Sequence, residues 1–285
     1  LGNQMFQYAA GRALADRLDA ELVLDTRAFD HVLARQVYTR RSYALSPFRL
    51  RARLATAADL KDWPVWVVEI GLRLRLLRPL IRPWYFQSGT GYDPGVTRLR
   101  EPVCLVGYWQ SERYFLDSAD GIRDDFGLLR ALSAANQQLL DLARSANSVG
   151  LHVRRGDFVS LADAAQVHGL CSIDYYRRAI SLIRDRCPEC HFLIFSDDPE
   201  WARAELPLDS SAVFVTGNEQ QPEQDLALMS ACRHHIIANS SFSWWAAWLG
   251  YSPEQRVIAP TPWYASAKLD ARDLALARWQ YISRV

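Results

Sequence analysis

The chain has 285 residues, 49% of them hydrophobic and 23% charged, which is typical of one large or two modest globular domains. Its formal net charge is +1, so it is not a general binder of nucleic acid, and any basic site must be local. The five cysteines are odd in number and widely scattered. This excludes a disulfide framework and favours a cytoplasmic protein.

The first residues predict an α/β unit. Leu1–Gln4 resembles a turn, and residues 5–18 carry apolar and small residues at helical spacing. Val23 and Leu24 form a short strand that ends at Asp25. Because a helix followed by a strand implies an earlier strand, we expect one to precede Leu1 in the native protein.

The middle of the chain is expected to be helical from about residue 55 to 84. Residues 63–86 form the longest apolar stretch, but arginines interrupt it, so it predicts a basic amphipathic helix and no transmembrane segment. This helix packs against its own domain or, alternatively, makes peripheral contact with an acidic membrane surface. We also expect no signal peptide.

An aromatic turn comes after the predicted strand at residues 102–106. Tyr108, Trp109 and Gln110 place rings beside an amide at the end of this strand. Aromatic faces stack on sugar rings while polar tips bind hydroxyl groups, so the turn is a candidate sugar site. The alternative is a buried aromatic corner.

Two helices, at residues 120–126 and 133–145, lead to a polar linker at residues 145–148, and Ser133 is placed to cap the second helix. We therefore expect an N-terminal domain over residues 1–146 and a C-terminal domain over residues 147–285.

Strands and helices alternate through the C-terminal half, which predicts a parallel sheet. The expected strands are 149–153, 191–195, 212–215, 235–238 and 257–259. The expected helices are 172–186, with Ser172 as its cap, then 199–206, 225–232 and 244–249.

The run Gly150–Asp157 joins a strand to two adjacent arginines. Arginine offers planar, bidentate donors that suit phosphate, so Arg154 and Arg155 predict a site for a phosphate-bearing ligand. Gly156 permits the positive φ of a tight turn, and Asp157 can cap the segment after it. An ordinary surface turn with a salt bridge is the alternative.

Two more strand ends carry polar groups. Ser196 and Asp197 come after one strand, and Asn239, Ser240 and Ser241 come after another and open a helix. The carboxyl ends of parallel strands share one edge, so we expect all three ends to face one crevice. Arginines and a helix N-terminus at that place suit a diphosphate leaving group.

Several motifs, in order along nearly the whole chain, resemble the α-1,2-fucosyltransferase family. They are Gly2–Tyr8, Gly107–Gln110, His152–Asp157, Phe195–Asp198, Ile237–Trp245 and Ile258–Pro260. The resemblance implies a GT-B-like α/β fold of two Rossmann-like halves facing a central cleft. It also implies transfer of L-fucose from GDP-β-L-fucose to the 2-hydroxyl of a terminal β-galactoside, with inversion and without a metal or cofactor.

By this resemblance, Arg154 contacts the diphosphate, Arg155 supports the turn, and His152 and Asp225 hold guanosine. The positions that line the β-phosphate or complete the donor set are Ser196, Asp197, Asn239, Ser240, Ser241 and Phe242. On the N-terminal side, Asn3 approaches the fucose. The acceptor galactoside is expected at Asp25, Tyr108, Trp109 and Gln110.

The catalytic set is then Arg154, Asn3 and a general base. Asp157, Asp25 and His152 are all conceivable bases, with Asp157 ranked first although the arginines can neutralise it. Asp197 and Asp198 are adjacent, so their side chains point apart on a strand end and do not suggest a metal pair.

Two rival functions remain. One is another nucleotide-sugar transferase on the same scaffold, using a different sugar. The other is an adhesion module that displays Arg155-Gly156-Asp157, which is unfavourable because the tripeptide lies directly after a buried strand.

Overall fold

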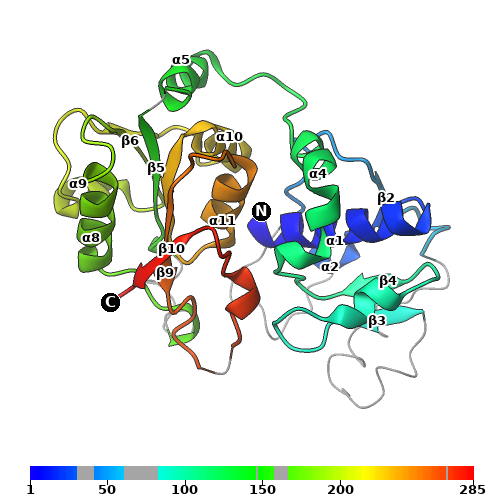
Figure 1. Cartoon of the computed structure of the whole chain (residues 1–285). Helices are drawn as coiled ribbons and strands as arrows, with labels where there is room; N and C mark the ends of the chain where they lie inside the picture. The colour runs from blue at the N-terminus through cyan, green and yellow to red at the C-terminus, as the bar shows by residue number, and fades with distance from the viewer. Residues whose placement is uncertain (31–41, 61–82, 146, 157–165, 268) are drawn as a thin grey trace. The chain divides into compact units, whose positions relative to one another are not determined.

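The computed structural model describes residues 1–30, 42–60, 83–145, 147–156, 166–267 and 269–285 (Figure 1). The chain packs as two compact units. The first holds Leu1, residues 3–129 and the segment 272–274, and the second holds Gly2, residues 130–271 and residues 275–285. Helix α5 (Ala134–Ala143) therefore belongs to the second unit, whereas the sequence placed the boundary after residue 146.

The second unit is built on a six-stranded sheet in the order β10-β9-β8-β5-β6-β7, with every neighbouring pair parallel. The strands are β5 (Ser148–Val153), β6 (His191–Ser196), β7 (Val213–Phe214), β8 (His234–Ile236), β9 (Val257–Thr261) and β10 (Gln280–Ser283). The predicted α/β class with a parallel sheet is confirmed. All six residues of β5 are buried, as expected for a central parallel strand.

Helices cover both faces of this sheet. In Figure 1, α8 (Ile173–Arg184) and α9 (Pro199–Glu205) lie on one side, and α10 (Pro222–Ala231) and α11 (Ser241–Leu249) on the other. Val149, Leu151 and Val153 of β5 pack with Tyr175 and Ile180 of α8 in one core.

Gly150 faces the opposite side of the sheet, where a Cβ would lie 3.0 Å from Met229 Cγ and 3.3 Å from Cys232 Sγ. A glycine in this strand thus permits the close approach of α10.

Local signals located most of these elements correctly. Ser172 and Ser133 are the N-caps of α8 and α5, because each hydroxyl accepts a hydrogen bond from a first-turn N–H. The prediction that 257–259 is the last strand is wrong, because β10 pairs with β9. Gln280 and Ser283 give β10 no hydrophobic alternation, so only its pairing reveals it.

The first unit contains two separate two-stranded parallel sheets within the residues described. One pairs β1 (Val23–Leu24) with β2 (Arg53–Leu54), and the other pairs β3 (Trp84–Phe86) with β4 (Cys104–Val106). Its α-helices are α1 (Gly2–Leu18), α2 (Arg27–Asp30) and α4 (Ala119–Asp125). Its 3₁₀-helices are η2 (Pro94–Arg98), η3 (Glu112–Tyr114), η4 (Leu116–Ser118) and η5 (Arg272–Leu274).

A buried polar cluster joins α1 to α4. The Tyr8 hydroxyl donates to Asp125 Oδ2 at 2.6 Å, and Arg12 Nε donates to the same oxygen at 3.2 Å. The expected turn at residues 1–4 is wrong, because α1 already begins at Gly2. Leu1 is thus the N-cap, and Gly2–Gln4 lie in the first turn of this helix.

The expected long helix is wrong wherever the structure describes it. Residues 55–60 form a loop and turn, and Trp84–Phe86 is a strand. Residues 61–82 lie outside the described part of the chain, and with them most of the 63–86 segment assigned to a possible membrane surface. Among the described helices, none has the length and apolar character needed to cross a bilayer.

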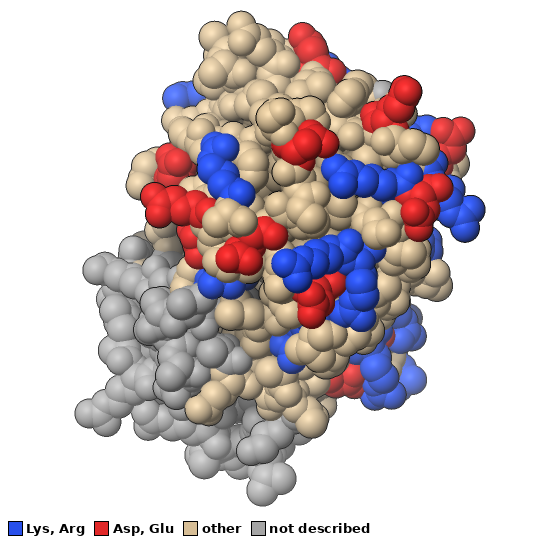
Figure 2. All heavy atoms as spheres, turned by 90° about the vertical axis from the view of Figure 1, so that its left-hand side faces the viewer, with Lys and Arg blue, Asp and Glu red and all other residues tan. Residues whose placement is uncertain are grey.

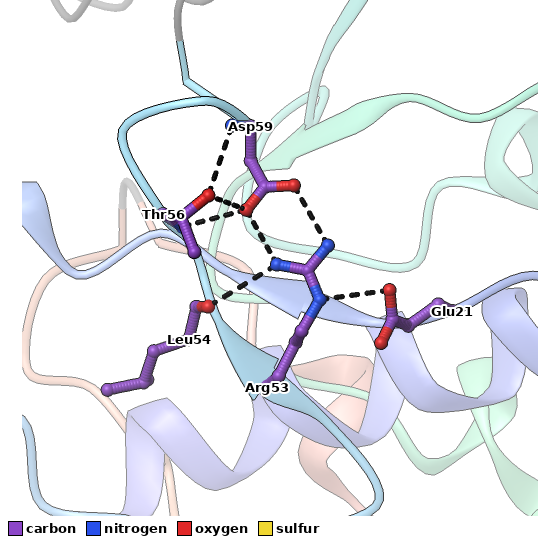
Figure 3. Close-up of polar contacts among 5 residues, drawn as sticks. All are labelled: Glu21, Arg53, Leu54, Thr56 and Asp59. Carbon is purple, nitrogen blue, oxygen red and sulfur yellow. Dashed lines mark hydrogen bonds and ion pairs between the residues drawn. The ribbon is translucent and has the colours of Figure 1, made fainter.

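Arg53 anchors the short β1–β2 sheet (Figure 3). Its guanidinium donates to both oxygens of Asp59, at 2.6 and 2.8 Å, and its Nε donates to Glu21 at 3.0 Å. Hydrogen bonds from Arg53 and Thr56 hold the pKa of Asp59 below its usual range. The hollow beside this group has a balanced lining of charged residues: Arg12, Arg51 and Arg53 with Asp16, Asp19 and Glu21.

On the face that carries α8 and α9, basic and acidic side chains are interspersed (Figure 2). Arg177 of α8 pairs with Asp174 one turn earlier, and Arg184 pairs with Asp209. This mixed pattern agrees with the small net charge of the chain.

Candidate active site

Three central strands of the second unit deliver polar groups to one edge of its sheet. β5 is hydrogen-bonded to β6 on one side and to β8 on the other, all parallel. Their carboxyl ends, and the residues directly after them, therefore meet at the same edge, as the sequence predicted. Helix α10 leads into β8, and α11 follows β8. Because connecting helices in such a sheet run opposite to the strands, the N-termini of both helices are at this edge as well.

Two arginines and two aspartates pair across the ends of β5 and β6. Arg154 Nη1 lies 2.9 Å from Asp197 Oδ2, and Arg155 Nε lies 3.1 Å from Asp198 Oδ2. The Arg155 guanidinium also covers the ring of Trp201 at 4.0 Å. The Arg155 side chain is thus held against the start of α9.

Asp197 also accepts hydrogen bonds from the backbone of the turn. Its Oδ1 accepts the Arg155 N–H at 2.8 Å, and its Oδ2 accepts the Gly156 N–H at 3.0 Å. Gly156 does not have the positive φ that the sequence suggested, because only Gly89, Gly169 and Gly217 of the described glycines do. The requirement is steric, since a Cβ at 156 would lie 2.7 Å from Asp197 Oδ2.

His152 lies at the end of β5 with 6% of its surface exposed. Burial lowers its pKa to about 4, with Asp197 opposing the change and Arg154 adding to it. The imidazole is therefore neutral at pH 7. Its Nδ1 has no hydrogen-bond partner among the described residues, and its ring centroid lies 5.4 Å from that of Phe242.

The N-terminus of α11 is formed by a serine pair. Ser240 is the N-cap, and its Oγ accepts the Phe242 N–H at 3.3 Å, while Ser241 is the first helical residue. Both serines and Phe242 are partly exposed. A helix N-terminus concentrates N–H groups and positive dipole, so this end suits an anion.

Asn239 holds neighbouring loops together. Its amide nitrogen donates to the carbonyls of His168, Gly169 and Trp263 at 2.9 to 3.1 Å, and it is only 3% exposed. The predicted donor-binding role of Asn239 therefore has little support, because these loops occupy its amide. The Ser196 hydroxyl also makes a local contact, since its Oγ accepts the Asp198 N–H at 2.9 Å.

Asp225, in the first turn of α10, is fixed by a buried amide network. Asn218 donates to its Oδ1 at 2.7 Å, and Asn136 of α5 donates to Asn218 at 2.8 Å and to Gln224 at 2.6 Å. Burial raises the pKa of Asp225 to about 6, helped by Glu219 and Glu223 and opposed by the Asn218 hydrogen bond.

In the first unit, Gln87 organises the aromatic turn after β4. Its Oε1 accepts the N–H groups of Tyr108 and Trp109 at 2.9 and 3.0 Å. Trp109 is 1% exposed, has a φ of 56°, and packs with Tyr85 and Tyr114. The prediction that its ring stacks on a sugar is therefore wrong, because it is part of the core. Tyr108 is 57% exposed.

Other N-terminal candidates lie at the surface of this unit. Gln110 Nε2 donates to Asn3 Oδ1 at 2.9 Å, so the aromatic turn and the start of α1 are joined. Asp25 forms a bidentate pair with Arg27. Although burial alone would raise the pKa of Asp25, the hydrogen bonds from Arg27 outweigh it and the net pKa is lowered, which makes Asp25 a weak base. Asp157 lies outside the described residues.

Three supporting polar residues were not expected from the sequence: Gln87, Asn136 and Asn218. All three side chains are buried. A buried amide and an exposed amide look alike in a sequence, so no local signal distinguishes these from ordinary surface residues.

Comparison with known proteins gives consistent matches. The family model "Glycosyl transferase family 11" matches residues 99–283. An alpha-1,2-colitosyltransferase of Escherichia coli is 34% identical, over 100% of this chain and 96% of that protein. The E. coli O-antigen biosynthesis glycosyltransferase WbnK is 32% identical, over 93% of this chain and 92% of that protein. Human galactoside alpha-(1,2)-fucosyltransferase 1 is 27% identical, over 87% of this chain and 62% of that protein.

Among solved structures, NodZ alpha-1,6-fucosyltransferase soaked with GDP-fucose covers 87% of this chain and 89% of its own, with a TM-score of 0.47 and 16% identity. POFUT1 in complex with GDP gives a TM-score of 0.44 at 11% identity, covering 90% of this chain and 95% of its own.

Proposed function

This chain belongs to glycosyl transferase family 11, and from that premise we propose that it moves L-fucose from GDP-β-L-fucose to the 2-hydroxyl of a terminal β-galactoside, with inversion. The observation that carries the proposal is the position of Arg154 and the N-terminus of α11 at the same edge of one sheet. Together they supply fixed positive charge where a diphosphate would leave.

The proposed reaction is a single displacement. The acceptor oxygen attacks the anomeric carbon on the face opposite GDP, and negative charge develops on the β-phosphate as the glycosidic bond to GDP breaks. Arg154 and the first N–H groups of α11 stabilise that charge. The acceptor proton passes to a carboxylate base, for which Asp157 is the first candidate from the sequence. Asp25 is poorly suited because its pKa is lowered, and His152 because its pKa is about 4.

Asp225 supports guanine as the base of the donor nucleotide. A carboxylate accepts two adjacent N–H donors, and guanine offers such a pair at N1 and its 2-amino group. Asn218 fixes the Asp225 carboxylate through Oδ1. Uridine lacks the second donor, so we expect GDP to bind far more tightly than UDP.

A second donor sugar has specific support. The E. coli relative that matches the full length of this chain at 34% identity is an alpha-1,2-colitosyltransferase. Colitose is L-fucose without its 3-hydroxyl, so the two donors differ by one polar group. A site that hydrogen-bonds that hydroxyl rejects the deoxy sugar strongly, whereas a site without such a contact accepts both.

The adhesion alternative requires that Arg155 be displayed to a partner protein. Arg155 is paired with Asp198 and stacked on Trp201, so its guanidinium is engaged within the second unit. The free state of all five cysteines suits the reducing cytoplasm, where we propose the protein acts.

The experiment that tests the proposal is a donor panel with lactose as acceptor. We expect turnover with GDP-fucose at a higher kcat/KM than with GDP-colitose, and none with UDP-galactose. A higher kcat/KM with GDP-colitose would show that colitose, and not fucose, is the sugar that this chain transfers. Turnover only with UDP-sugars would reject the guanine assignment.

A further inference from the structure

Asp197 has an unusual set of partners for a residue beside a candidate diphosphate site. Its two oxygens accept the N–H groups of Arg155 and Gly156 and pair with Arg154 Nη1, all between 2.8 and 3.0 Å. Three successive residues of the turn after β5 are thus attached to one carboxylate.

The backbone holds this carboxylate in a defined place. Asp197 lies directly after β6, and Arg154 directly after β5, where Val153 pairs with Ser196 in parallel register. The neighbouring Asp198 is anchored separately, because it caps α9 by accepting the Trp201 N–H and pairs with Arg155. Asp197 is therefore the partner of Arg154, and Asp198 is the partner of Arg155.

Electrostatics argue against a direct contact between Asp197 and the donor nucleotide. A carboxylate beside a diphosphate is repelled by it, and here the carboxylate is already used by three donors of the turn. An arginine fork can serve more than one acceptor, so a pair through Nη1 is compatible with phosphate binding by the same guanidinium.

We propose that Asp197 is a positioning residue, which sets the turn after β5 and aims the Arg154 guanidinium, without itself touching the donor nucleotide. This inference rests on the proposed function, because it gives Arg154 its role at the leaving diphosphate. It also changes the role expected for Asp197 from the sequence, which was direct donor binding.

The proposal predicts a split between binding and turnover. Removing the Asp197 charge takes a negative charge away from the side of Arg154, so GDP should bind at least as tightly as before. At the same time the fork loses its orientation, and misplacement of a group that stabilises the transition state lowers kcat by about tenfold to a hundredfold.

The test compares Asp197→Asn with the wild-type protein by calorimetric GDP titration, steady-state kinetics and thermal melting. We expect an unchanged or lower Kd for GDP with the stated loss of kcat. A Kd raised tenfold or more would show that Asp197 contacts the nucleotide or maintains its pocket, and an unchanged kcat would show that it does not aim Arg154. Either result overturns the proposal.

Gly156→Ala provides a second route to the same answer if the asparagine variant does not fold. The added Cβ would lie 2.7 Å from Asp197 Oδ2, so it displaces the carboxylate while every charge remains. The same loss of kcat with retained GDP binding supports the proposal, and full activity contradicts it.

Asp174→Asn is the matched control. It removes the same charge from an Asp–Arg pair of 3.2 Å on the exposed surface of α8, so both kcat and Kd should stay at wild-type values. Failure of the proposed function is a separate outcome. It would appear as absence of GDP binding and of transfer in the wild-type protein. Failure of this inference alone leaves a working wild type, with an Asp197→Asn variant that either keeps its kcat or binds GDP at least tenfold more weakly.

Discussion

Arg154 is the residue on which the proposed chemistry depends most. We expect Arg154→Ala to lower kcat by about a hundredfold or more, because it removes a charge aimed at the leaving group. Arg154→Lys should restore little, since a point charge does not reproduce the planar fork. Steady-state rates with GDP-fucose measure both. Arg177→Ala, which removes an exposed arginine of α8, is the control, and near-normal turnover of Arg154→Ala would contradict the assignment.

Replacing Asp225 should have opposite effects on GDP binding and on the stability of the fold. Its pKa of about 6 in the folded chain lies above the ordinary value, so its ionisation destabilises the fold increasingly as pH rises through 6. Asp225→Asn should therefore stabilise the protein at pH 7 by about 1–2 kcal/mol, after allowance for its partial exposure. If the carboxylate binds guanine, the same change should weaken GDP binding.

The pH dependence of the wild-type protein checks the same group. GDP affinity should fall as pH drops below about 6, because protonation removes the acceptor that guanine requires. Calorimetric titration between pH 5 and 8 measures this, with Asp225→Asn as the control that should lose the dependence. An equal pH dependence in that variant would assign the effect to another group.

At the scale of elements, the turn after β4 separates two aromatic residues with different roles. Trp109→Ala should cost about 3–5 kcal/mol of stability, because the ring is fully buried against Tyr85 and Tyr114. Tyr108→Ala should leave the melting temperature unchanged, since the ring is largely exposed.

The kinetic comparison tests where the acceptor binds. Tyr108→Ala should raise the KM for the galactoside and leave GDP affinity unchanged, because its ring is the exposed aromatic surface of the turn. Tyr251→Phe, which changes an exposed tyrosine of the second unit, is the control. An unchanged acceptor KM in Tyr108→Ala would remove this turn from the acceptor site.

The same elements show what the sequence could predict. Caps such as Ser172 and runs such as Val149–Val153 are local signals, so most helices and strands of the second unit were located from them. The remaining features depend on contacts between segments that are distant in the sequence. Strand β10 forms by pairing with β9, and Trp109 is buried by its contacts with Gln87 and Tyr85. Gly156 is required because Asp197 lies against it. Candidate site residues such as Arg154 can be proposed from a distinctive motif, whereas the buried amides beside them carry no such pattern.

At the scale of the whole molecule, we expect transfer to continue in excess EDTA. Within the described part of the chain, the carboxylates beside the proposed diphosphate site are Asp197 and Asp198, and each is paired with an arginine. They are therefore poor ligands for a cation, and arginine with a helix N-terminus can replace it. Rates measured with chelator and then with added Mg²⁺ or Mn²⁺ check this. Loss of turnover that the cation restores would contradict it.

The most direct test of the central claim is the structure of the product that the full chain makes from GDP-β-L-fucose and lactose. Nuclear magnetic resonance of the purified trisaccharide gives both the linkage and the anomeric configuration. We predict a single product with fucose in α linkage to the 2-hydroxyl of galactose. A β linkage would contradict the single displacement, and attachment at another hydroxyl would contradict the proposed acceptor specificity.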